Sequence, residues 1–276
     1  MIENNNKETS ISSNRYLMIA ARQQDAYNLK KGGYQQLKVI LKQEIRKLLQ
    51  RAGCVNPPIQ LNKVAQNLGV AIDTTHHVSC KGALCSKENN KVILVDKGLS
   101  SEKQQFVIAH EITHVLIARI MAETKKLRID APSKIEGLCD WGALEILIPY
   151  DWLLEKAIEP KPKGELILEI ASICGISPIL AAKRFSEYPL KKNTVIFWQQ
   201  SKKGFFASDA FPAPNSPPEI FYLPTKSALR NLRKTIKSNK PLSTTLELMI
   251  SGERNPYDVQ LYPLHDGICM SVTSIP

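Results

Sequence analysis

Hydrophobic residues in the first part of the chain change spacing from helical to strand-like. Residues 34–51 carry apolar side chains every three or four positions, which predicts an amphipathic helix. A shorter helix is predicted over 60–68 and a strand over 70–73. Two apolar runs, 82–85 and 91–95, flank a polar turn and predict a β-hairpin.

The middle of the chain holds its longest apolar stretches. Residues 106–117 and 135–149 are hydrophobic at helical spacing and are interrupted by few polar side chains, so each predicts a largely buried helix. Residues 165–187 predict two short helices about Gly175, a pattern similar to a helix-turn-helix. Plain packing is the commoner use of such a pair, and we favour it over DNA contact.

The last third of the chain changes character again. Short strand-like runs at 194–199, 205–207, 219–222 and 268–272 are separated by proline-rich loops. Between them, 227–238 has helical spacing. The pattern predicts a small α/β domain.

The apolar helix at 106–117 carries the candidate chemistry. His110 and His114 are four residues apart, so they lie on one helix face and can bind one metal ion. Glu111 follows His110 directly, and on a helix it can act as a general base toward water instead of binding the metal. Because unpaired polar groups are costly in a buried helix, a metal explains these side chains better than packing alone.

The second apolar helix supplies acidic residues for the same site. A catalytic zinc ion takes three protein ligands and keeps one open position, so Glu136 is the candidate third ligand. Asp140 lies one helical turn further on, where it can accept a hydrogen bond from a ligand histidine. The alternative is an amphipathic helix with two solvated acids. Mn²⁺ and Fe²⁺ also bind two histidines and a carboxylate, so we expect zinc but leave the metal open.

The two stretches FVIAHEITHVLI (106–117) and IEGLCDWGALEILIP (135–149) resemble the ImmA/IrrE metallopeptidases, whose signature is an AHExxH helix followed by an acidic helix. The resemblance covers about residues 34–190. It implies a zincin-like regulatory endopeptidase that cleaves a helix-turn-helix transcriptional repressor in a stress or mobile-element response. The chain departs from the family pattern at Thr113, where the family often has Gly, and at Leu138, where it often has a second acid.

Together these patterns predict an α+β protein with four parts. A polar tail (1–33) precedes a mostly helical zinc metallopeptidase domain with a small sheet (34–158). A helix-turn-helix-like pair (159–192) and a small α/β sensor domain (193–276) follow. The last part is similar in outline to the GAF-like domain of the radiation-response IrrE branch.

Zinc peptidases commonly pair an extended substrate with the strand that precedes the metal helix. We therefore expect Val92, Ile93 and Leu94 to form that edge strand.

The net charge is +11, and basic residues are concentrated in 38–51 and 226–240. A solvated face is the default explanation, yet the clustering favours an acidic partner or nucleic acid. The candidate contacts in the second cluster are Lys226, Arg230, Arg233, Lys234 and Lys237.

Composition narrows the setting of the protein. With 43% hydrophobic residues and no apolar run of membrane-spanning length, we expect no membrane segment. Six cysteines without disulfide-like spacing, together with a polar N-terminus that lacks a signal-peptide core, indicate a cytoplasmic protein.

Two alternatives to a peptidase remain at this stage. One is a non-catalytic metal-containing regulator that binds a transcription factor. The other is a direct DNA-binding protein that uses the pair at 165–187, which would show salt-dependent DNA affinity independent of zinc.

Overall fold

The structure is a computed structural model, and it describes most of the chain from residue 33 onward. The described residues are 33–76, 80–87, 90–124, 131–159, 161–187, 193–202, 204–211, 226–250 and 253–274. The architecture is α+β, as predicted, with two separate β-sheets. The predicted tail (1–33) and the predicted strand at 219–222 lie outside the described residues, except for Gly33.

The chain forms two compact units. One comprises Met1–Glu159 with Ser172–Ser177, and the other comprises Pro160–Ala171 with Pro178–Pro276. Four helices of the first unit correspond to predicted ones: α2 (Gly33–Arg51), α3 (Leu61–Asn67), α4 (Ser101–Glu123) and α5 (Pro132–Leu147). Helix α4 extends beyond the predicted 106–117 at both ends, and α6 (Tyr150–Ala157) follows α5. Gly53 and Gly69, with φ of 64° and 67°, reverse the chain after α2 and α3 in the left-handed conformation that glycine adopts without strain.

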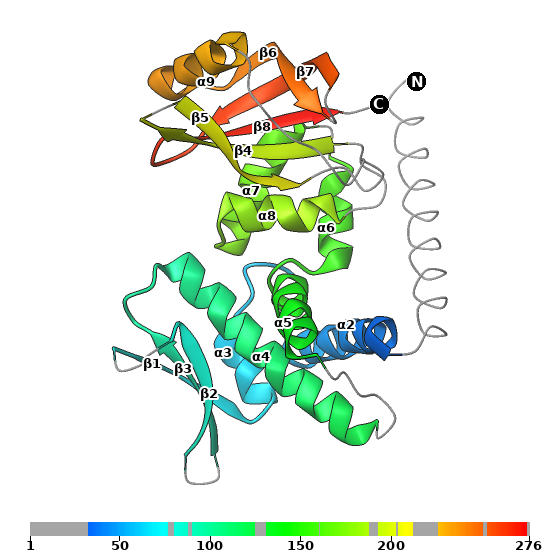
Figure 1. The fold of residues 1–276 in the computed structure, drawn as a ribbon. Helices are drawn as coiled ribbons and strands as arrows, with labels where there is room; N and C mark the ends of the chain where they lie inside the picture. The colour runs from blue at the N-terminus through cyan, green and yellow to red at the C-terminus, as the bar shows by residue number, and fades with distance from the viewer. Residues whose placement is uncertain are drawn as a thin grey trace, which may run out of the picture. The chain divides into compact units, whose positions relative to one another are not determined.

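Helix α4 is the core helix of the first unit. It packs against α5, α2, α3 and the small sheet (Figure 1). By length and composition alone α4 is long and apolar enough to cross a membrane, and it is the single unbroken helix among the described residues that passes this test. In the fold its apolar residues instead form the core: Ala109, Ile112, Val115, Leu116, Ile117 and Ile120 are buried.

A three-stranded sheet flanks α4 and corrects the predicted edge strand. The order is β1 (Val70–Thr75), β3 (Asn90–Asp96), β2 (Gly82–Lys87), with β1 parallel and β2 antiparallel to β3. The expectation that Val92, Ile93 and Leu94 form an edge is therefore wrong, because β3 is bonded on both sides. Ile93 is fully buried. Among the described residues, the edge strands of this sheet are β1 and β2, and β2 is the strand of the β2–β3 hairpin that has an open edge.

The second unit is built on a five-stranded antiparallel sheet of order β5-β4-β8-β7-β6. Three of its strands match predicted runs: β4 (Asn193–Ser201), β5 (Gly204–Phe211) and β8 (Ile268–Ser274). Two strands were not predicted, β6 (Leu242–Ile250) and β7 (Glu253–Pro263). In β7, Val259 and Leu261 are buried two residues apart, the alternation typical of a strand.

Helices cover both faces of this sheet (Figure 1). Helix α9 (Lys226–Ser238) packs Ala228 and Leu232 against one face, in a cluster with Trp198, Leu246 and Leu261. Helix α8 (Pro178–Ser186) packs on β4 and β5. Gly164 of α7 (Lys163–Cys174) lies so close to the Tyr262 ring that an added Cβ would be 1.9 Å from it.

Most of the predicted helix-turn-helix-like pair is thus a layer of this sandwich, whereas its turn, within Ser172–Ser177, belongs to the first unit. Helices α7 and α8 meet at 116°, within the range of about 90–120° typical of such a pair. Burial of Ala181, Ala182 and Phe185 shows that α8 is used for packing. DNA contact by the pair and the GAF-like assignment of the sheet remain predictions.

Candidate metal centre

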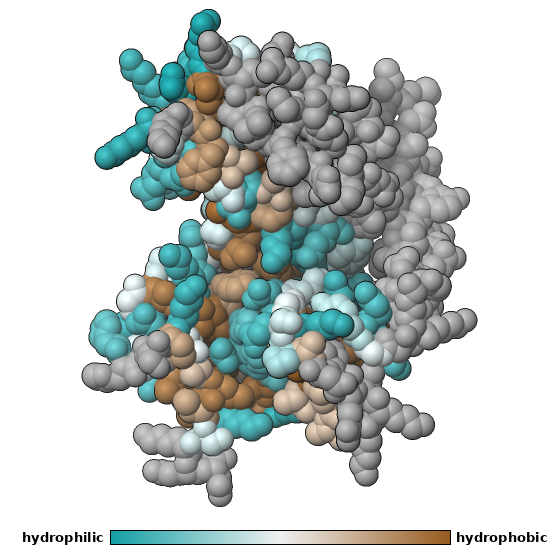
Figure 2. Space-filling view, viewed as in Figure 1, coloured by the Kyte–Doolittle hydropathy of each residue, from teal (hydrophilic) through white to brown (hydrophobic). Residues whose placement is uncertain are grey.

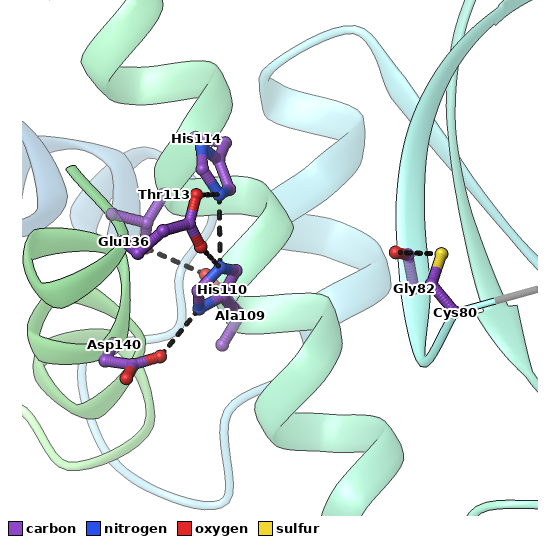
Figure 3. A network of polar contacts seen from close by, with 8 residues as sticks. All are labelled: Cys80, Gly82, Ala109, His110, Thr113, His114, Glu136 and Asp140. Carbon is purple, nitrogen blue, oxygen red and sulfur yellow. Dashed lines mark hydrogen bonds and ion pairs between the residues drawn. The ribbon is translucent and has the colours of Figure 1, made fainter. Parts of the chain in front are cut away.

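The candidate site lies where α4 crosses α5. His110 and His114 project from one face of α4, and their Nε2 atoms are 3.1 Å apart. Glu136 reaches them from the first half of α5, with one carboxylate oxygen 3.3 Å from His110 Nε2 and the other 3.4 Å from His114 Nε2. Figure 3 shows these three side chains pointing toward one another.

These separations fit a metal ion held by all three groups. Ligands about 2.0–2.2 Å from a tetrahedral metal are about 3.3–3.6 Å from one another. The three distances between donor atoms, 3.1, 3.3 and 3.4 Å, are close to that range. The histidine side chains are mostly buried, whereas 61% of the Glu136 side chain is exposed, so the site faces solvent on the side of the carboxylate.

Asp140 fixes the orientation of the first histidine. Its Oδ1 is 2.9 Å from His110 Nδ1, so Nδ1–H donates to the carboxylate and the lone pair of Nε2 is directed to the site (Figure 3). Burial by itself lowers the pKa of His110. The hydrogen bond and charge of Asp140, with the charges of Glu111 and Glu136, outweigh burial and raise the pKa above its ordinary value.

Glu111 lies on the side of α4 that faces the small sheet. An ideal Cβ built on Gly82 of β2 would be 3.7 Å from Glu111 Oε1 and 2.3 Å from Val107 of α4. Gly82 therefore lets the edge strand approach the metal helix closely beside the predicted general base. Sequence reasoning did not single out Gly82, although a glycine inside a strand pattern is a signal of close approach.

Cys139 is a second candidate ligand that sequence reasoning did not propose. Ligand atoms of His110, His114 and Cys139 lie within 4.8 Å of one another. Cys139 is fully buried, and burial, with the charges of Glu136, Glu111 and Asp140, raises the pKa of its thiol and disfavours the thiolate that binds metal. We favour Glu136, because both of its oxygens are already at ligand spacing.

The crossing of α4 and α5 depends on a small residue at the contact. Thr113, which lies between His110 and His114 in the sequence, is fully buried, and its hydroxyl donates to the Ala109 carbonyl at 2.8 Å. A Cβ on Gly142 of α5 would lie 2.4 Å from Thr113 Cγ2. The bulkier residue at 113 is thus accommodated by a glycine on the opposite helix, which keeps the acids of α5 within reach of the histidines.

The other predicted site residues lie elsewhere. Val92, Ile93 and Leu94 are in the central strand β3. The predicted basic contacts lie on α9, where Arg230, Arg233, Lys234 and Lys237 are exposed. The side chain of Lys226 lies outside the described residues.

Residues 55–186 match the peptidase family described as IrrE N-terminal-like domain. The chain carries an IrrE N-terminal-like domain. This match confirms the resemblance drawn from the two helix motifs, and it includes α4, α5 and all the residues of the candidate metal centre.

A solved structure supports the fold over a longer stretch. The chain is similar to a Mycobacterium tuberculosis transcriptional regulator, with a TM-score of 0.54 over 87% of this chain and 76% of that chain. Sequence identity is 14%, so the likeness shows a shared fold and no more. No curated protein matches the chain significantly by sequence.

Proposed function

We propose that this protein is a zinc-dependent regulatory endopeptidase that cleaves a helix-turn-helix transcriptional repressor. The observation that carries the proposal is the convergence of His110 Nε2, His114 Nε2 and Glu136 at ligand spacing, within a domain of a peptidase family. His110, His114 and Glu136 would hold the ion. When bound, zinc supplies a Lewis acid that polarises a carbonyl group and lowers the pKa of water.

The remaining chemistry belongs to the side chains of this chain. Glu111 is the general base: its carboxylate takes a proton from the attacking water and returns it to the leaving amine. Asp140 holds His110 in the tautomer whose Nε2 is free to bind metal. Gly82 keeps the β2 edge beside Glu111, so that a bound chain lies within reach of the base.

We further propose that an extended substrate segment adds to β2, in place of the expected β3. The Asp96 amide donates to the Lys81 carbonyl, so these two residues form a hydrogen-bonded pair between β2 and β3. Every second pair along an antiparallel ladder is of this kind, and the next one is Ala83 with Leu94. The backbone groups of Gly82, Leu84 and Ser86 then point to the open edge. Leu84, 36% exposed, offers an apolar contact on the α4 side of the sheet.

A cytoplasmic location and the stress or mobile-element context belong to the same proposal. The support for the location is that all six cysteines are free thiols, four of them buried, as is usual in a reducing compartment.

The deciding experiment compares bound metal and repressor cleavage in the wild type, Glu111→Gln and Glu136→Gln. We expect wild type to bind one equivalent of zinc and to cut, Glu111→Gln to keep zinc without cutting, and Glu136→Gln to lose both. Glu123→Gln, an exposed acid in the last turn of α4, is the matched control and should behave as wild type. If wild type binds zinc but cuts nothing while still binding the repressor, the protein is the non-catalytic regulator instead.

A further inference from the structure

The two basic segments of the sequence differ in how the structure uses them. In α2, Lys38 lies over the Trp141 ring at 4.5 Å and Lys42 over the Tyr150 ring at 4.6 Å. Two further cations of α2 are paired with acids, Arg46 with Asp151 and Lys47 with Glu44. Four of the five cations of α2 therefore serve contacts inside their own unit.

The cations of α9 are arranged differently. Arg230, Arg233, Lys234 and Lys237 are exposed, and α9 contains no acidic residue. No ion pair joins these four side chains to an acid within the part of the chain that the structure describes. We call these four residues the α9 basic face. Figure 2 shows hydrophilic side chains projecting over α9 at the top of the view.

The four cations of the α9 basic face lie on one side of the helix. At about 3.6 residues per turn, the four cations fall within an arc of about 100°, and the first and last are about 10 Å apart along the axis. Ala228, Leu232 and Thr235 occupy the opposite side and are fully buried. The helix is thus held on the sheet by its apolar side and turns its cations outward.

We propose that the α9 basic face binds the phosphate backbone of duplex DNA. Phosphates of one strand rise by about 3.4 Å each along the duplex axis and are about 7 Å apart along the winding strand, so a row about 10 Å long can contact two or three of them. Arginine and lysine are the usual partners of backbone phosphates, and such contacts position a protein without reading sequence. Charge complementarity therefore carries the proposal.

Other anionic partners fit this face less well. Membrane-surface helices insert an apolar side, whereas the apolar side of α9 is buried in its own unit. Protein interfaces have an apolar or aromatic centre, and single-stranded nucleic acids stack on aromatic side chains. The exposed large hydrophobic residues among those described are Val55, Leu84, Ile158 and Phe206, none of which belongs to α9.

The choice of DNA over double-stranded RNA rests on the proposed function, because the proposed substrate, a transcriptional repressor, binds DNA. Binding through α9 would hold the peptidase on the same duplex as its substrate. This role does not require zinc, so it can be tested apart from catalysis.

The test measures binding of the full-length, zinc-loaded protein to a short labelled duplex of arbitrary sequence over a range of salt concentrations. The variant is Arg230→Gln/Lys234→Gln/Lys237→Gln. Its matched control is Lys63→Gln/Lys97→Gln/Lys103→Gln, three exposed lysines of the first unit that lower the net charge equally. Thermal unfolding and zinc content establish that both variants are folded.

We expect the wild type and the control to bind alike, and the α9 variant to lose on the order of 10²-fold in affinity at about 0.1 M salt, with the log–log salt slope reduced by about 2.7. Equal losses in both variants, no binding by the wild type, or stronger binding to double-stranded RNA or to an acidic peptide would overturn the proposal. Cleavage of free repressor by the α9 variant separates this failure from failure of the peptidase, because α9 takes no part in the metal centre.

Discussion

The contact between Gly142 and Thr113 allows a sharp test of how the metal centre is built. Gly142→Ala places a methyl group 2.4 Å from Thr113 Cγ2, closer than carbon atoms can approach, so α5 must move away from α4. Asp140 lies two residues before Gly142 on the same helix, and Glu136 lies six residues before it. The movement therefore separates both acids from the histidines of α4.

The expected energies follow from two opposing effects. Forcing an extra carbon into a packed contact costs about 1–3 kcal/mol, whereas replacing a helical glycine by alanine gains about 1 kcal/mol. Gly142→Ala alone should thus lower the free energy of unfolding by about 0–2 kcal/mol. In a Thr113→Ala background the clash is absent, and Gly142→Ala should raise the free energy of unfolding by about 1 kcal/mol. The coupling energy is then about 1–3 kcal/mol.

Urea unfolding of wild type, both single variants and the double variant measures this coupling, and competitive chelation measures zinc affinity in the same four proteins. Gly137→Ala is the matched control, because the same substitution in α5 meets nothing within 4 Å. It should stabilise the protein by about 1 kcal/mol and leave zinc binding unchanged. A coupling energy below about 0.5 kcal/mol, or zinc affinity lost equally in the single and double variants, would refute the packing argument.

Three further predictions concern the ligands and the substrate edge. The raised pKa of His110 means that protons compete with the metal for this histidine, so zinc affinity should fall as the pH is lowered through that pKa. In the metal-free protein the charged histidine stabilises the fold below its ordinary pKa of about 6.5. This stabilisation is lost as the pH rises through the raised pKa. Asp140→Asn removes a cause of the rise, so titrations of zinc affinity should show its midpoint at lower pH than in wild type. With Co²⁺ in the site, Glu136 as third ligand predicts no thiolate charge-transfer absorption, and a band abolished by Cys139→Ser would show that the thiol binds instead. Leu84→Pro removes an outward N–H and should slow peptide cleavage with zinc retained, while Leu84→Ala keeps the N–H; equal slowing by both would assign the effect to the side chain.

Much of the site could be predicted because its spacing is local. Two histidines four residues apart must share a helix face, whatever the rest of the fold does. Glu136 and Asp140 share a face of the next helix for the same reason. The structure brings all four side chains together, with Asp140 2.9 Å from His110.

The sequence did not predict the edge strand correctly, because that depends on the order of the strands in the sheet. The hairpin β2–β3 and the strand β1 were all visible as runs, yet nothing in a run states which of its edges a third strand will occupy. The structure places β1 beside β3, as the parallel register from Val70 to Thr75 shows. The preference is physical: β3 buries Ile93 and Val95 completely and gains most from two neighbours, whereas β2 contains Gly82 and half-exposed side chains.

The same reasoning explains why charge counts alone could not select a binding surface. Segments 38–51 and 226–240 look alike in sequence, since each is a helix rich in lysine and arginine. An exposed cation is solvated by water and counterions, and only the fold shows whether a ring or an acid of the protein also lies near it. In α2 the rings of Trp141 and Tyr150 and the carboxylate of Asp151 do so from within the unit. On α9 no described acid does so, which makes an external anion the simplest partner for that helix and gives the salt dependence of DNA binding its diagnostic value.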